Sequence, residues 1–239
     1  CARIGAIHSI VFAGFSPERS LASTVPAPDP AADAARVLSE LLPAHGVAVA
    51  GAPRSGVAPD GAATVATLAS PPLSQVVAEM LSSSDNETAE SAMKEIGLAT
   101  SDQGTYAAGA AGLTELLSDA GVPLDGVQVV DGTGLTTEDH LTCAALVDVL
   151  TRPDTGSVLR DGMAVAGQTG TLALRWRDTP VAGRMRAKTG TLRNVTALAG
   201  EIATLAGGSP LTFAYVANVP DPGQVSAAEV GVDELAAIL

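Results

Sequence analysis

The residue types best suited to chemistry meet in one short stretch, Lys188-Thr189-Gly190-Thr191. The lysine ammonium supplies a positive charge and the threonine hydroxyls supply directed hydrogen bonds, a combination that suits a carboxylate. Gly190 has no side chain, so another backbone can approach it closely. The stretch predicts a strand along which a peptide-like ligand ending in a carboxylate would bind. An ordinary exposed turn that contains a lysine fits the same four residues, so they need support from elsewhere in the chain.

A second polar group, Ser84-Asp85-Asn86, lies far earlier in the chain. It falls between a helix predicted to open at Pro71-Pro72 and another predicted to begin at Glu87. Serine, aspartate and asparagine are common at helix ends, where their side chains satisfy free backbone groups. The group therefore has two interpretations, helix capping or a loop that presents a hydroxyl and a carboxamide to a cleft.

The elements around Lys188 follow the pattern of a β-hairpin. Residues 195–202 show strand-like alternation, and a second strand is predicted at residues 211–218. Between them lies Gly207-Gly208-Ser209-Pro210, where glycines and a proline favour a chain reversal. The Lys188 stretch is then expected on the strand immediately before this hairpin.

Helices and strands are also predicted along the rest of the chain. Asp29 is expected to cap a helix that Pro43 stops. Thr136 with Asp139 resembles a capping box, and the helix it opens would turn Cys143 toward the core. The remaining predictions are helices at 104–120 and 225–239, strands at 3–13, 47–50, 63–70 and 127–130, and a connector at 16–28.

Composition limits the classes of partner. The chain has 239 residues, a formal net charge of -13 and only 3% aromatic residues. An acidic surface with few stacking platforms argues against nucleic acid and anionic membranes. No apolar run approaches the roughly 18 residues that a membrane span requires. No signal peptide is visible, and a chain that opens on strand-like sequence is expected to be a segment of something longer.

The metal-ligating residue types are dispersed. Cys1 and Cys143 show no metal-ligand spacing, and the histidines at 8, 45 and 140 are far apart in the sequence. No metal or other cofactor is therefore expected. A disulfide between the two cysteines stays open, with a buried thiol at Cys143 as the alternative.

The Lys188 stretch has an echo in Gly167-Gln168-Thr169-Gly170-Thr171-Leu172. Glutamine cannot supply a cation, so the echo is interpreted as a loop leading into a short helix and not as a second site. Trp176 follows it and is expected to serve in packing.

The two polar groups together carry a family resemblance. Ser84-Asp85-Asn86 followed by Lys188-Thr189-Gly190 matches two of the three motifs of serine penicillin-recognising enzymes. Three segments, at 71–86, 131–136 and 183–191, resemble the D-alanyl-D-alanine carboxypeptidase/endopeptidase family, the class C low-molecular-mass penicillin-binding proteins of peptidase family S13. The resemblance covers essentially the whole chain, as the C-terminal half of such a protein.

This resemblance implies an α+β fold of the penicillin-binding, serine β-lactamase-like transpeptidase type, with helices flanking an antiparallel sheet. Members of the family carry domains inserted within the transpeptidase-like domain. Residues 1–58 would be the returning end of that insertion, and residues 59–239 the C-terminal part of the catalytic domain. The resemblance also implies a place outside the cytoplasmic membrane, in the cell envelope, the periplasm or the medium.

The family's first motif, SxxK, is missing from its expected place. The single match, Ser91-Ala92-Met93-Lys94, follows Ser84-Asp85-Asn86, whereas the family's motif precedes it by a long interval. We interpret this match as accidental. The nucleophile-bearing N-terminal half is then a required partner of this chain.

The mechanism that the resemblance implies is acyl transfer from peptidoglycan stem peptides ending in D-Ala-D-Ala, with β-lactams entering the same path. Ser84 would relay a proton, Asn86 would bind the substrate amide, and Lys188 would lie near Ser84. Thr189 and Thr191 would bind the terminal carboxylate beside Gly190, and the Thr191 N–H would supply half of an oxyanion hole.

Two alternatives stay open. A class A β-lactamase shares both motifs, but no Glu-x-x-Leu-Asn stretch lies between them, and the nearest approach is at residues 138–142. A non-enzymatic module that binds peptidoglycan stems through Lys188 would need no nucleophile.

Overall fold

The computed structural model describes residues 9–14, 21–67, 69–204, 207–219 and 233, with side chains from residue 27 onward. The chain divides into two compact units, Cys1–Ala69 and Ser70–Leu239. The predicted boundary at residue 58 lies before this division, and the origin of residues 1–58 in an inserted domain stays a prediction.

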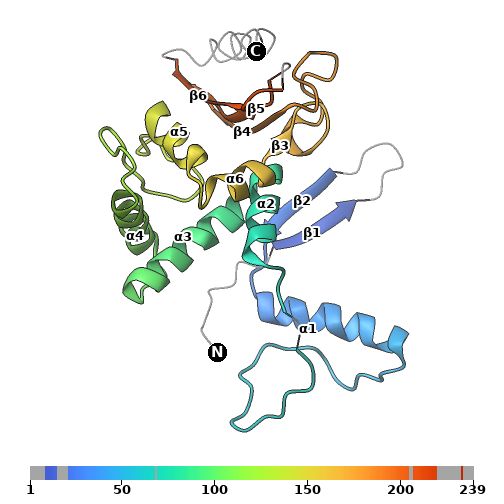
Figure 1. Cartoon of the computed structure of the whole chain (residues 1–239). Helices are drawn as coiled ribbons and strands as arrows, with labels where there is room; N and C mark the ends of the chain where they lie inside the picture. Colours follow the sequence, from blue (N-terminus) through green and yellow to red (C-terminus); the bar gives the residue numbers. More distant parts are fainter. Residues whose placement is uncertain (1–8, 15–20, 68, 205–206, 220–232, 234–239) are drawn as a thin grey trace. The chain divides into compact units, whose positions relative to one another are not determined.

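The first unit contains a hairpin and a helix (Figure 1). Strand β1 (Ser9–Gly14) pairs antiparallel with β2 (Leu21–Pro26), and α1 (Pro30–Leu41) continues into the 3₁₀ helix η1 (Leu42–His45). Asp29 caps α1 as predicted, because its carboxylate accepts a hydrogen bond from Ala32 N at 3.0 Å.

Three predictions for residues 16–70 need correction. Residues 21–26, expected within a connector, form β2, because pairing with β1 satisfies their backbone and places Pro26 harmlessly at the strand end. Residues 47–50 and the described part of 63–70 form no strand. Neither has a partner strand among the described residues, and apolar alternation without a ladder does not hold an extended segment in a sheet.

The second unit begins with a group of helices. These are α2 (Leu73–Ser83), α3 (Asn86–Ser101), α4 (Tyr106–Asp119), α5 (Cys143–Thr151) and α6 (Gly156–Gly162). Helices α3 and α4 pack on each other, and α2 packs on α6 (Figure 1). The predicted helices at 71–81, from 87 and at 104–120 are confirmed to within a few residues.

A four-stranded antiparallel sheet follows, in the order β3-β4-β5-β6. Its strands are β3 (Ala164–Val165), β4 (Met185–Leu192), β5 (Val195–Ile202) and β6 (Leu211–Asn218), with η2 (Gly170–Leu172) between β3 and β4. The predicted strands at 195–202 and 211–218 are confirmed with their antiparallel pairing. Helices α5 and α6 contact the sheet, which confirms the α+β architecture.

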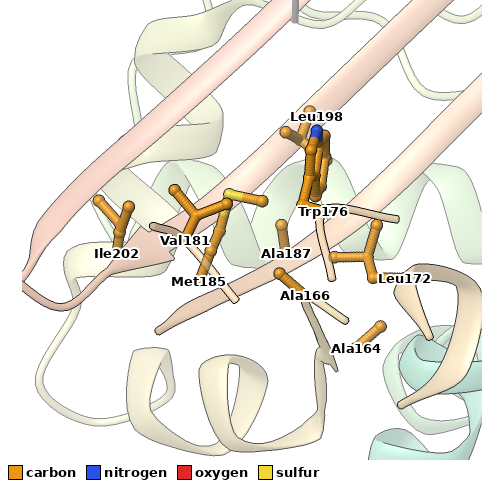
Figure 2. Packing of buried hydrophobic residues seen from close by; sticks show 9 residues of the cluster. All are labelled: Ala164, Ala166, Leu172, Trp176, Val181, Met185, Ala187, Leu198 and Ile202. Carbon is orange, nitrogen blue, oxygen red and sulfur yellow. The ribbon is translucent and has the colours of Figure 1, made fainter. Parts of the chain in front are cut away.

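The hydrophobic core lies on one face of this sheet (Figure 2). Leu198 and Ile202 of β5 point into it, as strand alternation requires. Trp176 is buried there, which confirms its expected role in packing. The cluster consists of Ala164, Ala166, Leu172, Trp176, Val181, Met185, Ala187, Leu198 and Ile202.

The segment between α4 and α5 differs from expectation. Residues 127–130 form no strand but a single bridge, in which Gln128 pairs with His140. Helix α5 begins at Cys143 and not near Thr136. The predicted capping box does not form, because Thr136 N donates to Asp131 and the Asp139 carboxylate accepts from Val130 N instead. Thr142 is the cap instead.

Cys143 is exposed, contrary to the expected packing, because it occupies the first position of α5. Cys1 and the predicted helix at 225–239, apart from Asp233, lie outside the described residues, so the disulfide stays a prediction. Among the described residues, no helix is both long and apolar enough to cross a membrane.

We predict that Gly200→Ala destabilises the second unit. A Cβ atom at Gly200 would lie 2.0 Å from Arg186 O and 2.7 Å from Ala187 Cα, both backbone atoms of β4. Overpacking of this kind costs about 1–3 kcal/mol. Denaturant unfolding should show the loss. The matched control is Gly104→Ala, where the nearest atom is Lys94 O at 3.8 Å. Equal stability of both variants would contradict the prediction.

Candidate active site

The two polar groups singled out in the sequence meet in space. Lys188 lies on β4, and its Nζ donates a hydrogen bond to Ser84 Oγ at 2.7 Å. The same ammonium donates to Thr189 O, also at 2.7 Å. The predicted proximity of Lys188 and Ser84 is therefore observed, although 104 residues separate them.

Ser84 occupies a strained backbone position at the corner between two helices. It is the C-cap of α2 with φ 60° and ψ 48°, in the left-handed region. A non-glycine residue there costs on the order of 1–3 kcal/mol and persists only where its surroundings hold it. Asp85 supplies that hold, since its carboxylate accepts hydrogen bonds from Glu87 N and Thr88 N and starts α3. The capping interpretation is thus confirmed for Asp85, and the functional interpretation of Ser84 and Asn86 stays a prediction.

Asn86 is the first residue of α3 and is exposed. Asn86 follows Ser84 by two residues, and both lie at the corner between α2 and α3. Its position leaves the carboxamide accessible to solvent.

Burial shapes the electrostatics of Lys188. Partial desolvation disfavours its charged form and lowers the pKa of its ammonium below the ordinary 10.5. A lysine with a lowered pKa releases its proton more readily, and it lies within hydrogen-bond reach of the Ser84 hydroxyl. The pair can therefore move a proton between Ser84 Oγ and Lys188 Nζ.

The remaining predicted site residues continue along β4. Thr189 is half-buried, and Gly190 and Thr191 are exposed. On the other side of the strand, β5 pairs with all of them. In contrast, β3 pairs only with Ala187 and Arg186. From Lys188 onward, no strand in the described part of the chain covers this edge of β4, which leaves backbone groups to pair with an extended ligand.

Thr171 is a neighbour of the site that the sequence did not reveal as such. Thr189 Oγ1 and Thr171 Oγ1 are hydrogen-bonded at 3.2 Å. The echo of the Lys188 stretch was visible in the sequence, but nothing local showed that the chain folds it back beside β4.

The Ser91-Ala92-Met93-Lys94 match lies on α3, away from these contacts. Ser91 is exposed and donates its hydroxyl proton to Glu87 O, while Lys94 Nζ sits 4.3 Å from the centre of the Tyr106 ring. Neither side chain contacts Ser84 or Lys188 through a hydrogen bond.

Two further observations concern polar side chains in the described part of the chain. Glu90 of α3 has a buried Oε2 atom with no hydrogen-bond partner among the described residues. Such an atom is costly to leave unsatisfied. No cluster of histidine, cysteine and acidic residues in the described ranges could hold a metal ion.

Comparison with known proteins gives a consistent result. The model of the D-Ala-D-Ala carboxypeptidase 3 (S13) family matches residues 3–239. Carboxypeptidase DacB of Mycolicibacterium smegmatis is 31% identical over 99% of this chain and 52% of its own length. The D-alanyl-D-alanine carboxypeptidase of Actinomadura sp. strain R39 is 35% identical over 80% of this chain and 37% of its own length. The chain thus spans about half or less of these relatives.

Solved structures share the fold. Penicillin-binding protein 4 of Haemophilus influenzae, complexed with a β-lactam, superposes with a TM-score of 0.64 at 22% identity, over 84% of this chain and 47% of that one. A predatory endopeptidase of Bdellovibrio bacteriovorus, acylated by penicillin G, gives 0.52 at 19% identity, over 69% and 43%. These similarities confirm the predicted penicillin-binding fold.

The lowered pKa of Lys188 predicts a stability change at alkaline pH. Between the folded-state pKa and 10.5, the unfolded chain holds more protons at this residue than the folded chain. The free energy of unfolding should therefore rise with pH through that window, as far as this group contributes. Denaturant unfolding at a series of pH values, compared with Lys188→Met, isolates the contribution. A Lys188→Met variant with the same slope would show that Lys188 is not desolvated.

Proposed function

The chain belongs to the D-Ala-D-Ala carboxypeptidase 3 (S13) family, and on that premise we propose that it is the C-terminal half of a serine-type D-Ala-D-Ala carboxypeptidase/endopeptidase. Its substrates would be peptidoglycan stem peptides, and β-lactams would acylate it. The observation that carries the proposal is the 2.7 Å hydrogen bond from Lys188 Nζ to Ser84 Oγ, which joins the two motifs at one site.

The proposed reaction is acyl transfer. A serine hydroxyl of the N-terminal half gives up its proton to the lysine of the same SxxK motif, attacks the carbonyl between the two D-alanines and forms an ester. The bond to the terminal D-alanine breaks, and that residue leaves as an amine. Ser84, hydrogen-bonded to Lys188, passes a proton to that leaving nitrogen. Water then attacks the ester, releases the shortened peptide and restores the serine hydroxyl.

The other residues hold the substrate. Thr189 and Thr191 bind the terminal carboxylate, with Lys188 contributing positive charge. Gly190 permits the substrate backbone to lie close to β4, on the edge that β3 leaves uncovered. The Thr191 N–H donates to the developing oxyanion, and Asn86 hydrogen-bonds the substrate amide.

Two features support a required N-terminal half. The relatives are about twice as long as this chain or longer. Glu90 Oε2 is buried without a donor among the described residues, which suits a donor supplied by another segment. Strands from the missing half would also complete the sheet.

The alternatives are weaker. The family match replaces the class A β-lactamase interpretation, and residues 138–142 lie in a bridge and loop that precede α5. A non-enzymatic peptidoglycan-binding module uses the same Lys188 site and differs only in lacking acylation, so the labelling experiment below separates it.

A peptidoglycan substrate places the working protein outside the cytoplasmic membrane. Fractionation of the source cells should recover it from the envelope or the medium. Recovery entirely from the cytosol would contradict this localisation.

We predict that Lys188→Ala in the complete protein slows acylation by β-lactams and leaves the fold intact. Hydrogen bonds to a charged group are worth roughly 1.5–3 kcal/mol, which corresponds to about tenfold to a hundredfold in rate. Stopped-flow or gel-based labelling with a fluorescent penicillin measures the effect. Lys94→Ala is the matched control, because Lys94 lies on α3 and its ammonium contacts the ring of Tyr106. Unchanged kinetics in Lys188→Ala would remove Lys188 from the site.

We also predict that residues 1–239 produced alone form no covalent penicillin adduct. Ser84 is assigned the role of proton relay and not of nucleophile. The Ser91 hydroxyl donates a hydrogen bond to Glu87 O of its own helix. Adding the N-terminal half as a second polypeptide should restore labelling, with the adduct on that half. An adduct mapped by mass spectrometry to Ser84 or Ser91 would overturn the assignment of the nucleophile.

A further inference from the structure

The echo segment at residues 167–172 lies beside the site and is held rigidly. Leu172 is fully buried in the sheet core, and its carbonyl accepts a hydrogen bond from Gly167 N at 3.0 Å. Thr169 Oγ1 accepts from Val165 N at 2.9 Å, which ties the segment to β3. The segment is thus fixed by packing at one end and by hydrogen bonds to its own neighbours.

The missing side chain of Gly170 lets the echo segment pack directly against α2. A Cβ atom at Gly170 would lie 2.2 Å from Ser82 O and 3.0 Å from Ala164 Cβ. The backbone conformation, with φ 54°, also favours glycine. Since Ser82 precedes Ser84 by two residues, η2 is held close to the same turn of α2 that carries Ser84.

Thr171 of η2 extends this arrangement to β4. Its Oγ1 lies 3.2 Å from Thr189 Oγ1. Thr171 is exposed and Thr189 half-buried, so a ligand can reach the pair. The backbone of Thr189 is also fixed, because its carbonyl oxygen accepts a hydrogen bond from Lys188 Nζ.

We propose that Thr171 is a positioning residue that orients the Thr189 hydroxyl toward the ligand carboxylate. The assignment rests on the proposed function of Thr189. Each hydroxyl has one proton and accepts through its lone pairs. When Thr189 donates its proton to a carboxylate, it cannot donate to Thr171, so Thr171 donates to Thr189 instead. The hydrogen bond from Thr171 keeps the Thr189 proton directed at the ligand carboxylate and polarises the Thr189 hydroxyl.

The two hydroxyls therefore form a short hydrogen-bond relay, in which a bound carboxylate selects the hydroxyl that donates to the other. The two hydroxyl oxygens lie 3.2 Å apart, so either hydroxyl can donate to the other. Without the Thr171 hydroxyl, the Thr189 side chain loses the partner that selects its rotamer, since threonine in general has more than one accessible χ1 state.

The test compares Thr171→Val and Thr171→Ser in the complete protein. Valine keeps the branched shape without the hydroxyl, and serine keeps the hydroxyl. Acylation by penicillin G should slow about threefold to tenfold in Thr171→Val, the range expected for one hydrogen bond. Thr171→Ser should restore the rate to within about twofold of wild type, because the hydroxyl is what the relay requires.

Two further readouts separate this relay from a merely structural role. Acylation by penicillin G methyl ester, which lacks the carboxylate, should be the same in wild type and Thr171→Val. In addition, Thr171→Val should cause no further loss in a Thr189→Val background, because residues that act through one another are not additive.

Thr114→Val is the matched control, since Thr114 donates to Ala110 O on α4 and should behave as wild type. Equal slowing with the ester, or additive losses in the double variant, would overturn the relay. If penicillin G acylates the wild-type protein normally and Thr171→Val reacts at the same rate, only the role assigned to Thr171 would be overturned. A wild-type protein that neither compound acylates would overturn the proposed function and this assignment with it.

Discussion

The burial of the Lys188 ammonium constrains the second unit, because a partly desolvated ammonium requires hydrogen-bond acceptors close by. It finds the Ser84 hydroxyl and the Thr189 carbonyl. Each acceptor depends on a different element. Ser84 lies at the corner where α2 ends and Asp85 starts α3. Thr189 lies on β4, which β5 pairs along its whole length.

The site is therefore built between elements and not on any one of them. β4 supplies the cation and the threonines, the α2–α3 corner supplies a strained serine, and η2 lies beside both. The buried face of the sheet keeps this arrangement rigid, since Leu172 and Met185 are anchored in the same core. A small displacement of any one element would separate groups that must remain within hydrogen-bond distance.

Sequence patterns predicted the parts of this structure that follow from local chemistry. The cap at Asp29, the helix after Pro71-Pro72 and the hairpin at 195–218 each have a strong local signal, and all were observed. Motif order, through the family resemblance, predicted that Lys188 lies near Ser84. The failures share a physical cause. β2 forms because of a partner strand, Asp139 is diverted by the backbone N–H of Val130, and Thr171 reaches Thr189 through tertiary packing. The residues next to each of these three contacts carry no sequence signal that predicts it.

The shortness of β3 has a directional consequence for anything that pairs with β4. Because β3 occupies the edge only at Arg186 and Ala187, a strand lying along residues 188–192 can extend past Leu192 but is obstructed beyond Lys188. If it runs antiparallel to β4, as every neighbouring pair in this sheet does, its C-terminal end meets that obstruction. Under the proposed function, this strand pairing favours an extended ligand whose chain ends beside Lys188.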